Sequence, residues 1–383
     1  MDQVAMELIQ QCSVTFLVLF STQCSAMKLS TSTVSSLPGH WPANYCRVTN
    51  LVFDLGRKLL LVHGNDIEET DRCFGLTDIW PVALLEREDD LICDQVFREG
   101  HFFTIYYYHG SNYFHLHYDT MLPLFGTLYA SKAGDVEDVL LLPGVEAKRG
   151  QKIDWDVDAF LDGKMYWNQM LQNLAGPSQI LPLDRRLSMI NKTICFQDAF
   201  FGTPKINLSD RGVIAGFVRR VRKVLDISCP KERHFPKPRV GIIHREGRRK
   251  ILNEAALLEG IKSFSRGIRV DYEEMTFKEQ VWQTQELDIL IGMNGAGLTN
   301  AIYLPPGGVA VQLVPYKGDE LNVQEFRALL EARGPYLEWY NAHPENNVAT
   351  FGDDSGHTSD TYVDVEEFVY LVKNATNLLL SRM

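Results

Sequence analysis

The sequence predicts an α/β protein of two lobes, the second of which is a parallel, doubly wound sheet. The chain has 383 residues, which is more than one hydrophobic core usually organises, so two lobes with a cleft between them are expected. From residue 239 onward, short apolar runs alternate with helical patterns, and this alternation is typical of a parallel sheet. A glycine-rich turn follows one of these apolar runs, at the place where such sheets bind ligands.

The composition is that of an ordinary globular protein and argues against nucleic acid as the main partner. Hydrophobic residues make up 45% of the chain and charged residues 23%, and both values are typical of folded proteins. The formal net charge is −11, whereas binding to nucleic acid depends on an excess of Lys and Arg. A site for an anionic ligand must therefore be local.

The N-terminal segment and the cysteines indicate the secretory pathway. An apolar stretch at residues 14–20 is too short to span a bilayer, and residues 1–26 are interpreted as a signal peptide or a truncated signal anchor. The five cysteines beyond it show no CxxC or Cys/His spacing, which favours disulfides over a metal cluster. N-glycosylation sequons stand at Asn191, Asn207 and Asn374. We expect a location in the endoplasmic reticulum or Golgi lumen, or secretion, with membrane attachment only through an N-terminal anchor.

The N-terminal lobe is expected over residues 27–235, where the strand patterns are less regular. Residues 47–62 are interpreted as two short strands around a turn at Gly56. Further strands are expected at residues 138–142 and 193–196.

The C-terminal lobe is expected over residues 236–383, after a basic, proline-containing linker. Its expected strands are residues 239–245, 269–272, 287–293 and 309–314, and its expected helices are residues 253–264, 277–283 and 363–381. Ligands of a doubly wound sheet bind at the carboxyl ends of its strands. Arg245 and the turn at residues 294–297 each follow directly on a strand and are therefore the first candidates for a binding site.

The turn at residues 294–300 reads Asn-Gly-Ala-Gly-Leu-Thr-Asn. Its two glycines let backbone N–H groups approach a phosphate at a helix N-terminus. The alternative is a tight strand-to-helix turn without a ligand, and the turn alone leaves that alternative open. A dinucleotide-binding fingerprint is rejected, because its third glycine would fall at Asn300 and the turn lies late in the chain.

A basic cluster at residues 245–250 ends one strand and precedes a helix. Guanidinium groups at this position could hold a diphosphate through bidentate hydrogen bonds. Charge runs are usually solvated surface, so the cluster alone does not decide between the two interpretations. Its position beside the glycine-rich turn in a parallel sheet favours the diphosphate.

A third segment, residues 112–123, combines histidines with a carboxylate. If the segment is helical, His115 and Asp119 share a face, whereas His117 points elsewhere. A carboxylate beside an imidazole holds its tautomer and raises its basicity, as a general base requires. The alternative is a structural, hydrogen-bonded His115 in a helix capped by Asn112, and the chemistry favours neither.

Together these three segments resemble glycosyltransferase family 61. The residues that carry the resemblance are Asn112, His115, Asp119 and Pro123; Arg245, Arg249, Asn253 and Glu254; Glu273, Thr276 and Phe277; and residues 291–316. The resemblance implies a GT-B architecture of two Rossmann-like lobes with the donor held mainly by the C-terminal lobe. It further implies an inverting transferase that moves a sugar from a UDP-sugar to a protein-linked acceptor. The expected sugar is N-acetylglucosamine, and the expected acceptor is O-mannose or a hydroxyl of a glycoprotein.

The resemblance also implies roles for individual residues. His115, oriented by Asp119, is the expected catalytic base. The expected donor-binding residues are Arg245, Arg249, Asn253, Glu273, Asn294, Gly295, Ala296, Gly297, Leu298 and Thr299. No cofactor or metal is expected, because the arginines would replace the charge of a metal ion. Asp154 and Asp156, with Asp158 nearby, have the Asp-x-Asp spacing with which many transferases hold Mn²⁺. They lie outside the matched segments and no strand leads cleanly into them, so they are interpreted as an acidic surface loop.

Asn294 is a departure from the family, which usually has histidine at this place. Asparagine can donate a hydrogen bond to phosphate or ribose, but it cannot take up a proton. The alternative function is therefore a catalytically weakened family member that acts as a sugar- or partner-binding protein. A third class, an intracellular nucleotide-binding enzyme, would have reduced cysteines and unmodified sequons.

Overall fold

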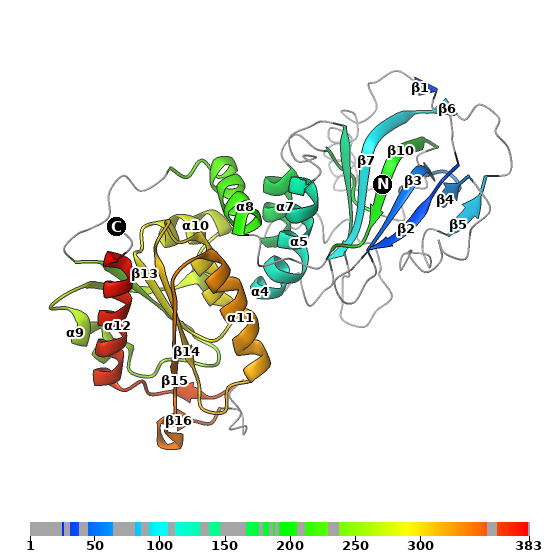
Figure 1. Cartoon of the computed structure of the whole chain (residues 1–383). Coiled ribbons are helices and arrows are strands. Elements are labelled where there is room, and N and C mark those ends of the chain that lie inside the picture. Colours follow the sequence, from blue (N-terminus) through cyan, green and yellow to red (C-terminus); the bar gives the residue numbers. More distant parts are fainter. Residues whose placement is uncertain are drawn as a thin grey trace, which may run out of the picture. The chain divides into compact units, whose positions relative to one another are not determined.

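A computed structural model of the chain (Figure 1) describes its C-terminal part almost throughout and its N-terminal part in segments. The described residues are 25–26, 31–37, 45–63, 81–85, 92–105, 112–130, 138–145, 166–175, 179–183, 187, 191–204, 211–228, 237–350 and 358–381. Residues 1–24 of the interpreted leader, the sequon at Asn207 and the acidic segment 154–158 lie outside the described residues.

The chain divides into two compact units. Unit 1 comprises residues 1–108 and 119–206, and unit 2 comprises residues 109–118 and 207–383. The sequence predicts a division after residue 235, with residues 109–118 in the N-terminal lobe. The structure instead groups this short early segment, which contains His115, with the C-terminal part of the chain.

Unit 1 contains a mixed, eight-stranded sheet. Its strands are β2 (Val34–Leu37), β3 (Tyr45–Asp54), β4 (Leu59–Val62), β5 (Val82–Leu84), β7 (Gln95–Ile105), β8 (Val139–Val145), β9 (Gln179–Ile180) and β10 (Thr193–Phe201). Their order is β5-β4-β3-β10-β7-β8-β9, with β2 also paired to β3. Strand β10 runs parallel to β7 but antiparallel to β3. The predicted hairpin around Gly56 is confirmed as β3 and β4, while the sheet as a whole is mixed rather than purely parallel.

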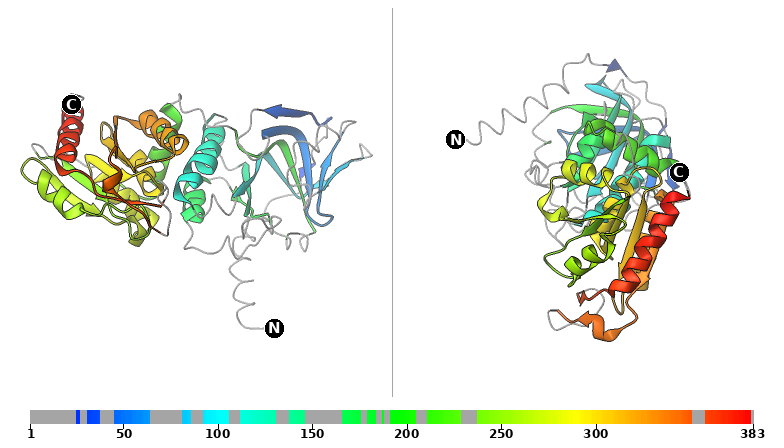
Figure 2. Two further views of the ribbon diagram at one scale, coloured as in Figure 1. Left: turned by 90° about the horizontal axis from the view of Figure 1, so that it is seen from below. Right: turned by 90° about the vertical axis from the view of Figure 1, so that its left-hand side faces the viewer.

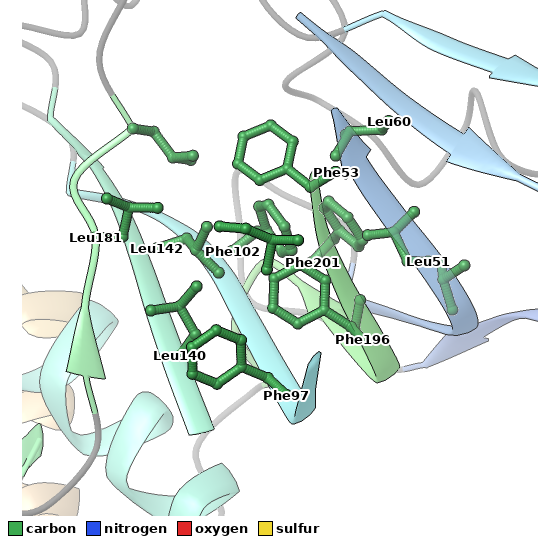
Figure 3. Packing of buried hydrophobic residues seen from close by; sticks show 14 of the residues in the cluster. Leu51, Phe53, Leu60, Phe97, Phe102, Leu140, Leu142, Leu181, Phe196 and Phe201 are labelled. Carbon is green, nitrogen blue, oxygen red and sulfur yellow. The ribbon is translucent and has the colours of Figure 1, made fainter. Parts of the chain in front are cut away.

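One face of this sheet carries an aromatic core (Figure 3). The rings of Phe102 and Phe201, from β7 and β10, stack with their centroids 4.5 Å apart. Phe102 also meets Phe53 and Phe196 edge-on, at 5.8 Å and 5.6 Å. Aromatic pairs prefer these stacked and edge-on arrangements and contribute beyond the area that they bury. The three central strands are therefore held together by ring packing as well as by backbone hydrogen bonds.

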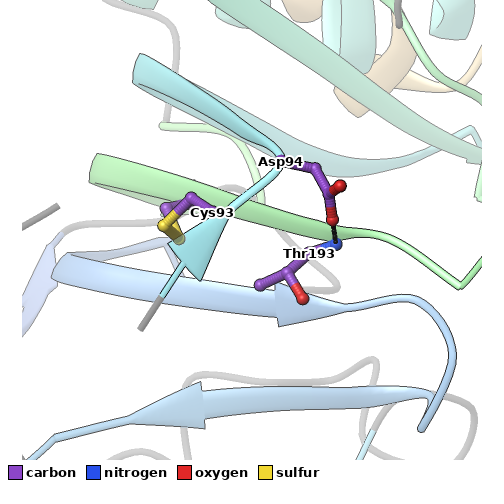
Figure 4. The surroundings of a disulfide bond; sticks show 4 residues. Cys93, Asp94 and Thr193 are labelled. Atoms are coloured by element: carbon purple, nitrogen blue, oxygen red, sulfur yellow. Dashed lines mark hydrogen bonds between the residues drawn. A yellow bond between two sulfur atoms is a disulfide. The ribbon is translucent and has the colours of Figure 1, made fainter. Parts of the chain in front are cut away.

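A disulfide between Cys93 and Cys195 joins β6 (Ile92–Cys93) to β10 across 102 residues of sequence (Figure 4). Beside it, a side-chain oxygen of Asp94 accepts a hydrogen bond from the backbone N–H of Thr193 at 2.7 Å. Cys46 is disulfide-bonded as well. The expectation of disulfides is thus confirmed for these cysteines. Strand β1 (Ser25–Ala26), at the end of the interpreted leader, pairs with β6.

Unit 2 is a five-stranded parallel sheet, as its sequence pattern predicts. Its strands are β11 (Arg239–Ile243), β12 (Arg266–Val270), β13 (Ile289–Met293), β14 (Val309–Val314) and β15 (Tyr336–Tyr340), in the order β12-β11-β13-β14-β15. All four neighbouring pairs are parallel. The sequence interpretation found the first four strands but not β15, an edge strand whose side chains are mostly half-buried.

Helices cover both faces of this sheet (Figures 1 and 2). The helices of unit 2 are α8 (Arg211–Val224), α9 (Glu254–Ile261), α10 (Phe277–Gln285), α11 (Glu320–Arg333) and α12 (Val365–Leu380), besides the short α4 (Tyr113–His115). Helices α9 and α12 close one face through buried side chains such as Leu257 and Phe368. A reciprocal cap between Thr276 and Glu279 fixes the start of α10. The predicted helices at residues 253–264, 277–283 and 363–381 are confirmed with shifted ends.

The π-helical turn η1 (Leu116–Met121) begins in unit 2 and ends in unit 1, while α5 (Leu122–Ala130) and α7 (Tyr166–Ala175) belong to unit 1. Within the described part of the chain, no helix has the length and apolar character needed to cross a membrane.

Two of the three predicted glycosylation sequons lie on described residues. Asn191 is exposed, just before β10, whereas Asn374 is half-buried within α12. Oligosaccharides are attached to accessible asparagines, typically on surface loops. Asn191 is therefore the better placed of the two, and modification of each site stays a prediction.

Removal of the Cys93–Cys195 disulfide is expected to lower the free energy of unfolding. The bond closes a loop of 102 residues, and loss of such a constraint on the unfolded chain costs about 4 kcal/mol. The measurement is urea denaturation of the wild type and of the Cys93→Ala/Cys195→Ala variant without reductant. As a control, reductant should bring the unfolding midpoints of the two proteins closer together, because it breaks the disulfide of the wild type. Equal midpoints without reductant would contradict the prediction.

Candidate functional site

The candidate site lies at the carboxyl ends of β11 and β13, where the strand order of unit 2 reverses. The chain runs from β11 to β12 on one side and then returns to β13 on the other side of β11. A reversal of this kind leaves a crevice outside the carboxyl ends of the two central strands, and ligands of doubly wound sheets bind there. The loop after β11 carries the predicted arginines, and the turn after β13 begins at Asn294.

The two segments touch through the arginine side chains. Nη1 of Arg249 donates a hydrogen bond to Oδ1 of Asn294 at 3.4 Å. A Cβ atom placed on Gly295 would lie 2.4 Å from Nη1 of Arg245 and 3.4 Å from Cζ of Arg249. Only glycine therefore lets the Arg245 guanidinium group lie against the backbone of the turn. The predicted proximity of the basic cluster and the glycine-rich turn is confirmed, and their binding role stays a prediction.

Arg245 is held within its own loop and is half-buried. Its Nε donates a hydrogen bond to the backbone carbonyl of Arg248 at 2.9 Å. Burial lowers the pKa of Arg245, and the negative charge of Glu273 acts in the opposite direction. An arginine remains cationic at neutral pH in such surroundings. The structure thus brings Glu273, another predicted site residue, into the electrostatic environment of the loop.

Asn294 is 7% exposed and offers an unused donor. Its Oδ1 accepts from Arg249, which assigns the amide orientation. Within the described residues, Nδ2 of Asn294 is buried without a hydrogen-bond partner, and so is Oγ1 of Thr299. A buried polar atom without a partner costs about 1–3 kcal/mol, so such atoms mark places where a ligand or water is expected.

The rest of the predicted turn starts a 3-10 helix, η5 (Ala296–Tyr303). The N–H of Leu298 donates to the carbonyl of Gly295 at 2.9 Å, and the side chain of Leu298 is fully buried. Ala296 and Gly297 are half-buried and stand where backbone N–H groups lack helical partners. Leu298 therefore shapes the turn, whereas Ala296 and Gly297 stand at the helix start, where backbone N–H groups are expected to face a bound anion.

Asn253, another predicted donor-binding residue, is used by the fold itself. Its Nδ2 donates to the carbonyl of Val363 at 2.7 Å, and its Oδ1 accepts from the N–H of Val363 at 3.0 Å. Both ends of the amide are thus engaged with one backbone position 110 residues away. Asn253 fastens the segment before α12 to the start of α9.

The early segment with His115 is fastened to the glycine-rich turn. Asn112 caps it, accepting from the N–H groups of the next helical residues. The hydroxyl of Tyr113 donates to Oδ1 of Asn300 at 2.9 Å, and Nδ2 of Asn300 donates to the carbonyl of Gly297 at 3.2 Å. One asparagine side chain therefore links the predicted catalytic segment to the predicted phosphate turn.

His117, rather than His115, is the buried histidine of this segment. Its Nδ1 donates to the carbonyl of Tyr113 at 2.7 Å, and its Nε2 accepts from the hydroxyl of Tyr303 at 2.8 Å. Burial lowers the pKa of His117 to about 4, while the bond to the Tyr113 carbonyl partly opposes the shift. His117 is therefore neutral at physiological pH and serves to hold the segment.

The helix geometry around His115 differs from the expectation. The predicted alignment of His115 with Asp119 assumes an α-helix, whereas residues 116–121 form a π-helix. In a π-helix the repeat lengthens from i+4 to i+5, so four-residue spacing no longer places two side chains directly one above the other. The pairing of His115 with Asp119 stays a prediction. The side chain of His115 is half-buried.

Among the described residues, one group of side chains has the composition of a metal site. Ligand atoms of His244, Glu246 and Asp271 lie within 4.8 Å of one another. Nη2 of Arg269 lies 3.6 Å from Oε1 of Glu246 and 3.5 Å from Oδ2 of Asp271. Because Arg269 lies against both carboxylates and both ring nitrogens of His244 already face carboxylates, we assign no metal there. Sequence reasoning missed this group, although His244 and Asp271 each follow directly on a parallel strand.

The fold and the site define an α/β protein that has cationic side chains and a glycine-rich turn at its topological switch point. Comparison with known proteins then gives the family. Residues 113–311, more than half of the chain, match the family model described as Glycosyltransferase 61. The matched range begins at Tyr113 and contains both the arginine loop and the glycine-rich turn. The chain belongs to glycosyltransferase family 61.

Two groups of curated relatives are similar to the chain. The EGF domain-specific O-linked N-acetylglucosamine transferase of Gallus gallus is 32% identical over 216 residues, covering 49% of this chain and 38% of the relative. The protein O-linked-mannose beta-1,4-N-acetylglucosaminyltransferase 2 of Homo sapiens is 28% identical over 268 residues, covering 63% of this chain and 42% of the relative. The chain thus spans about two fifths of the length of these relatives.

The buried His117 predicts a loss of stability at acid pH. Its folded-state pKa of about 4 lies below the value of about 6.5 for an unfolded histidine, so the unfolded state takes up the proton first. As pH falls from about 6.5 toward 4, this group should remove up to about 3 kcal/mol from the free energy of unfolding.

The test is urea denaturation of the wild type and of His117→Gln at pH 7 and pH 4.5. The stability advantage of the wild type should shrink at the lower pH, because glutamine does not titrate. If the difference in the free energy of unfolding between the two proteins is the same at both pH values, His117 is not a buried neutral group.

Proposed function

We propose that the chain is an inverting glycosyltransferase of the GT-B type, which moves N-acetylglucosamine from a UDP-sugar to a protein-linked acceptor. The observation that carries the proposal is the position of Arg245 and Arg249 against Gly295 at the switch point of a parallel sheet. The names of the relatives support the donor sugar, since both groups are named for transfer of N-acetylglucosamine. Their names also support a protein-linked acceptor, which is an EGF domain in one group and O-linked mannose in the other.

In this proposal, unit 2 holds the donor through its diphosphate. Arg245 and Arg249 supply permanent positive charge, and charge-assisted hydrogen bonds to phosphate are about twice as strong as neutral ones. The unused Nδ2 of Asn294 and the backbone N–H groups at Ala296 and Gly297 add neutral donors. The same groups would stabilise the negative charge that develops on the departing UDP. Thr299, buried in the same turn, would contribute its hydroxyl.

The remaining predicted donor residues have supporting roles. Glu273 acts on the charge of Arg245, Leu298 fixes the turn by its burial, and Asn253 anchors the loop to residue 363. None of the three needs to contact the donor for the site to form. The proposal therefore places direct contact with phosphate on the arginines, Asn294 and the start of η5.

The reaction is proposed as a single displacement. The acceptor hydroxyl oxygen attacks the anomeric carbon, the bond from that carbon to the diphosphate oxygen breaks, and UDP leaves with the electron pair. His115, with Asp119 as its partner, takes the proton of the acceptor hydroxyl as general base. The hydrogen bonds from Tyr113 to Asn300 and from Asn300 to Gly297 support this role, because they fix the segment of His115 to the donor turn. No metal or other cofactor is required.

We also propose that the protein is located in the secretory pathway. A disulfide between Cys93 and Cys195 is typical of oxidising compartments, and the sequons fit the endoplasmic reticulum or Golgi lumen. The alternative function is a weakened family member that binds a sugar or a partner. It is favoured by Asn294, a side chain that cannot protonate a leaving group.

The activity is tested by transfer of labelled N-acetylglucosamine from UDP-N-acetylglucosamine to an O-mannosyl peptide and to a folded EGF domain, with EDTA present. Transfer to one acceptor should persist in EDTA, since the arginines take the place of a metal. His115→Ala should lose most of the turnover, by about 100-fold or more for a general base, with UDP affinity unchanged. Binding of donor without turnover on either acceptor would support the alternative, and a strict Mn²⁺ requirement would overturn the metal-free site.

The diphosphate assignment predicts that Arg245→Ala weakens UDP binding. Loss of a charge-assisted contact in a partly buried site should cost about 2 kcal/mol, which is roughly a thirtyfold rise in Kd. The measurement is isothermal titration with UDP, with the melting temperature recorded for each protein. Arg266→Ala, an exposed arginine on β12, is the control and should bind normally. Unchanged affinity in a folded Arg245→Ala variant would refute the assignment.

A pair of glycine variants separates the position of the guanidinium group from its charge. The Cβ atom in Gly295→Ala would meet Nη1 of Arg245 at 2.4 Å and displace it, whereas a Cβ atom on Gly247 has open space around it. We therefore expect Gly295→Ala to weaken UDP binding about as much as loss of the arginine, roughly thirtyfold. Gly247→Ala, in the same loop, should have no effect. Equal affinities for the two variants would contradict the close approach as a requirement for binding.

A further inference from the structure

His244 stands between the parallel sheet and the arginine loop, and carboxylates flank both of its ring nitrogens. It follows β11 directly and precedes Arg245 in the chain. Its Nδ1 lies 2.9 Å and 3.0 Å from the two carboxylate oxygens of Glu254, and its Nε2 lies 2.9 Å from Oε1 of Glu246. The side chains of His244 and Glu254 are only 14% and 12% exposed. The imidazole therefore bridges the loop and the first residue of α9.

Only a protonated ring satisfies both contacts. A neutral imidazole has one N–H donor, and carboxylate oxygens can only accept, so one of the two contacts needs a second proton on the ring. Burial lowers the pKa of His244, but the hydrogen bonds to Glu246 and Glu254 outweigh burial and raise the pKa above its usual value. The geometry and the charges therefore both favour the imidazolium form of His244.

The groups that face His244 come from three elements. Besides Glu246 in the loop and Glu254 on α9, Asp271 approaches from the end of β12. Arg269 lies close to two of these carboxylates and acts against protonation of the ring, and the positive charge of Lys250 acts on Glu246. With the ring protonated, these three carboxylates are matched by three cations, namely His244, Arg269 and Lys250. Loss of the proton leaves the group with a net charge of −1.

We infer that His244 is a positioning residue for the diphosphate-binding loop and that it holds this loop only in its protonated form. The inference rests on the proposed donor site, because the loop in question carries Arg245 and Arg249. When the proton leaves, one carboxylate faces a ring nitrogen that no longer donates, so the bridge between the loop and α9 opens. The extra negative charge also disfavours an anion nearby. Both effects weaken donor binding as pH rises.

Donor affinity is expected to fall as His244 loses its proton. Because the pKa of His244 is raised, this fall lies above the ordinary histidine value of about 6.5. At lower pH the bridge is complete and donor affinity is highest. Binding of the donor in turn favours the protonated ring and shifts its titration upward, because the two equilibria are linked.

The test is isothermal titration with UDP-N-acetylglucosamine between pH 6 and pH 8.5. A nucleotide sugar is used because neither phosphate of its diphosphate diester titrates in this range, unlike the terminal phosphate of UDP. We expect the Kd of the wild type to rise about fivefold, the scale of one unit charge near an anion in a partly exposed site. His244→Gln keeps a donor without the charge, so its Kd should match the high-pH wild type at every pH.

The matched control is His343→Gln, another histidine beside a carboxylate, Glu345, but 56% exposed and outside the loop. It should retain the wild-type profile. A flat wild-type profile, or a His244→Gln variant that keeps the slope, would overturn the inference while leaving the donor site intact. Absence of binding at every pH would instead refute the proposed donor site.

A second measurement keeps the inference testable without a ligand. The imidazole titration of His244, followed by NMR in the wild type and assigned with the His244→Gln spectrum, should have a pKa above 6.5. A pKa at or below 6.5 would overturn the inference whether or not the donor binds. Thermal melting of each variant shows that the comparison is made between folded proteins.

Discussion

The arrangement of the candidate site depends on one close approach, that of the Arg245 guanidinium group to the backbone of Gly295. It is available because β11 and β13 are neighbours in a parallel sheet, so that the loop after one strand meets the turn after the other. Hydrogen bonds at the carboxyl edge of the sheet fix the side chains around this contact. Arg249 orients Asn294, and the Arg248 carbonyl holds the side chain of Arg245. A cationic site forms locally in a chain whose net charge is −11.

Much of unit 2 could be predicted from the sequence, because its elements are set by local patterns. The apolar run at residues 289–293, the cap at Thr276 and the glycines of the turn each carry a signal within a few residues. Together with the alternation of strands and helices, they were enough to place Arg245 beside residue 294. Strand β15 was missed because its residues lie at the sheet edge and are only half-buried.

The contacts that complete the site could not be predicted, because they join residues far apart in the chain. His117 meets Tyr303 across 186 residues, and Asn253 meets Val363 across 110. The role of His244 depends on its contact with Glu254. The two residues come together only when the loop between them folds, and their spacing in the sequence does not predict this contact. The π-helical turn at residues 116–121 has no local pattern that separates it from an α-helix. The segment of His115 therefore belongs to unit 2 because of contacts with residues far along the chain, which the sequence of the segment itself does not indicate.

The measurement that tests the central claim most directly is a crystal structure of the chain with UDP bound. We expect the diphosphate to lie at the switch point, within hydrogen-bond distance of Arg245 or Arg249 and of the backbone N–H groups at the start of η5. UDP bound elsewhere on unit 2, with both arginine side chains facing solvent, would contradict it.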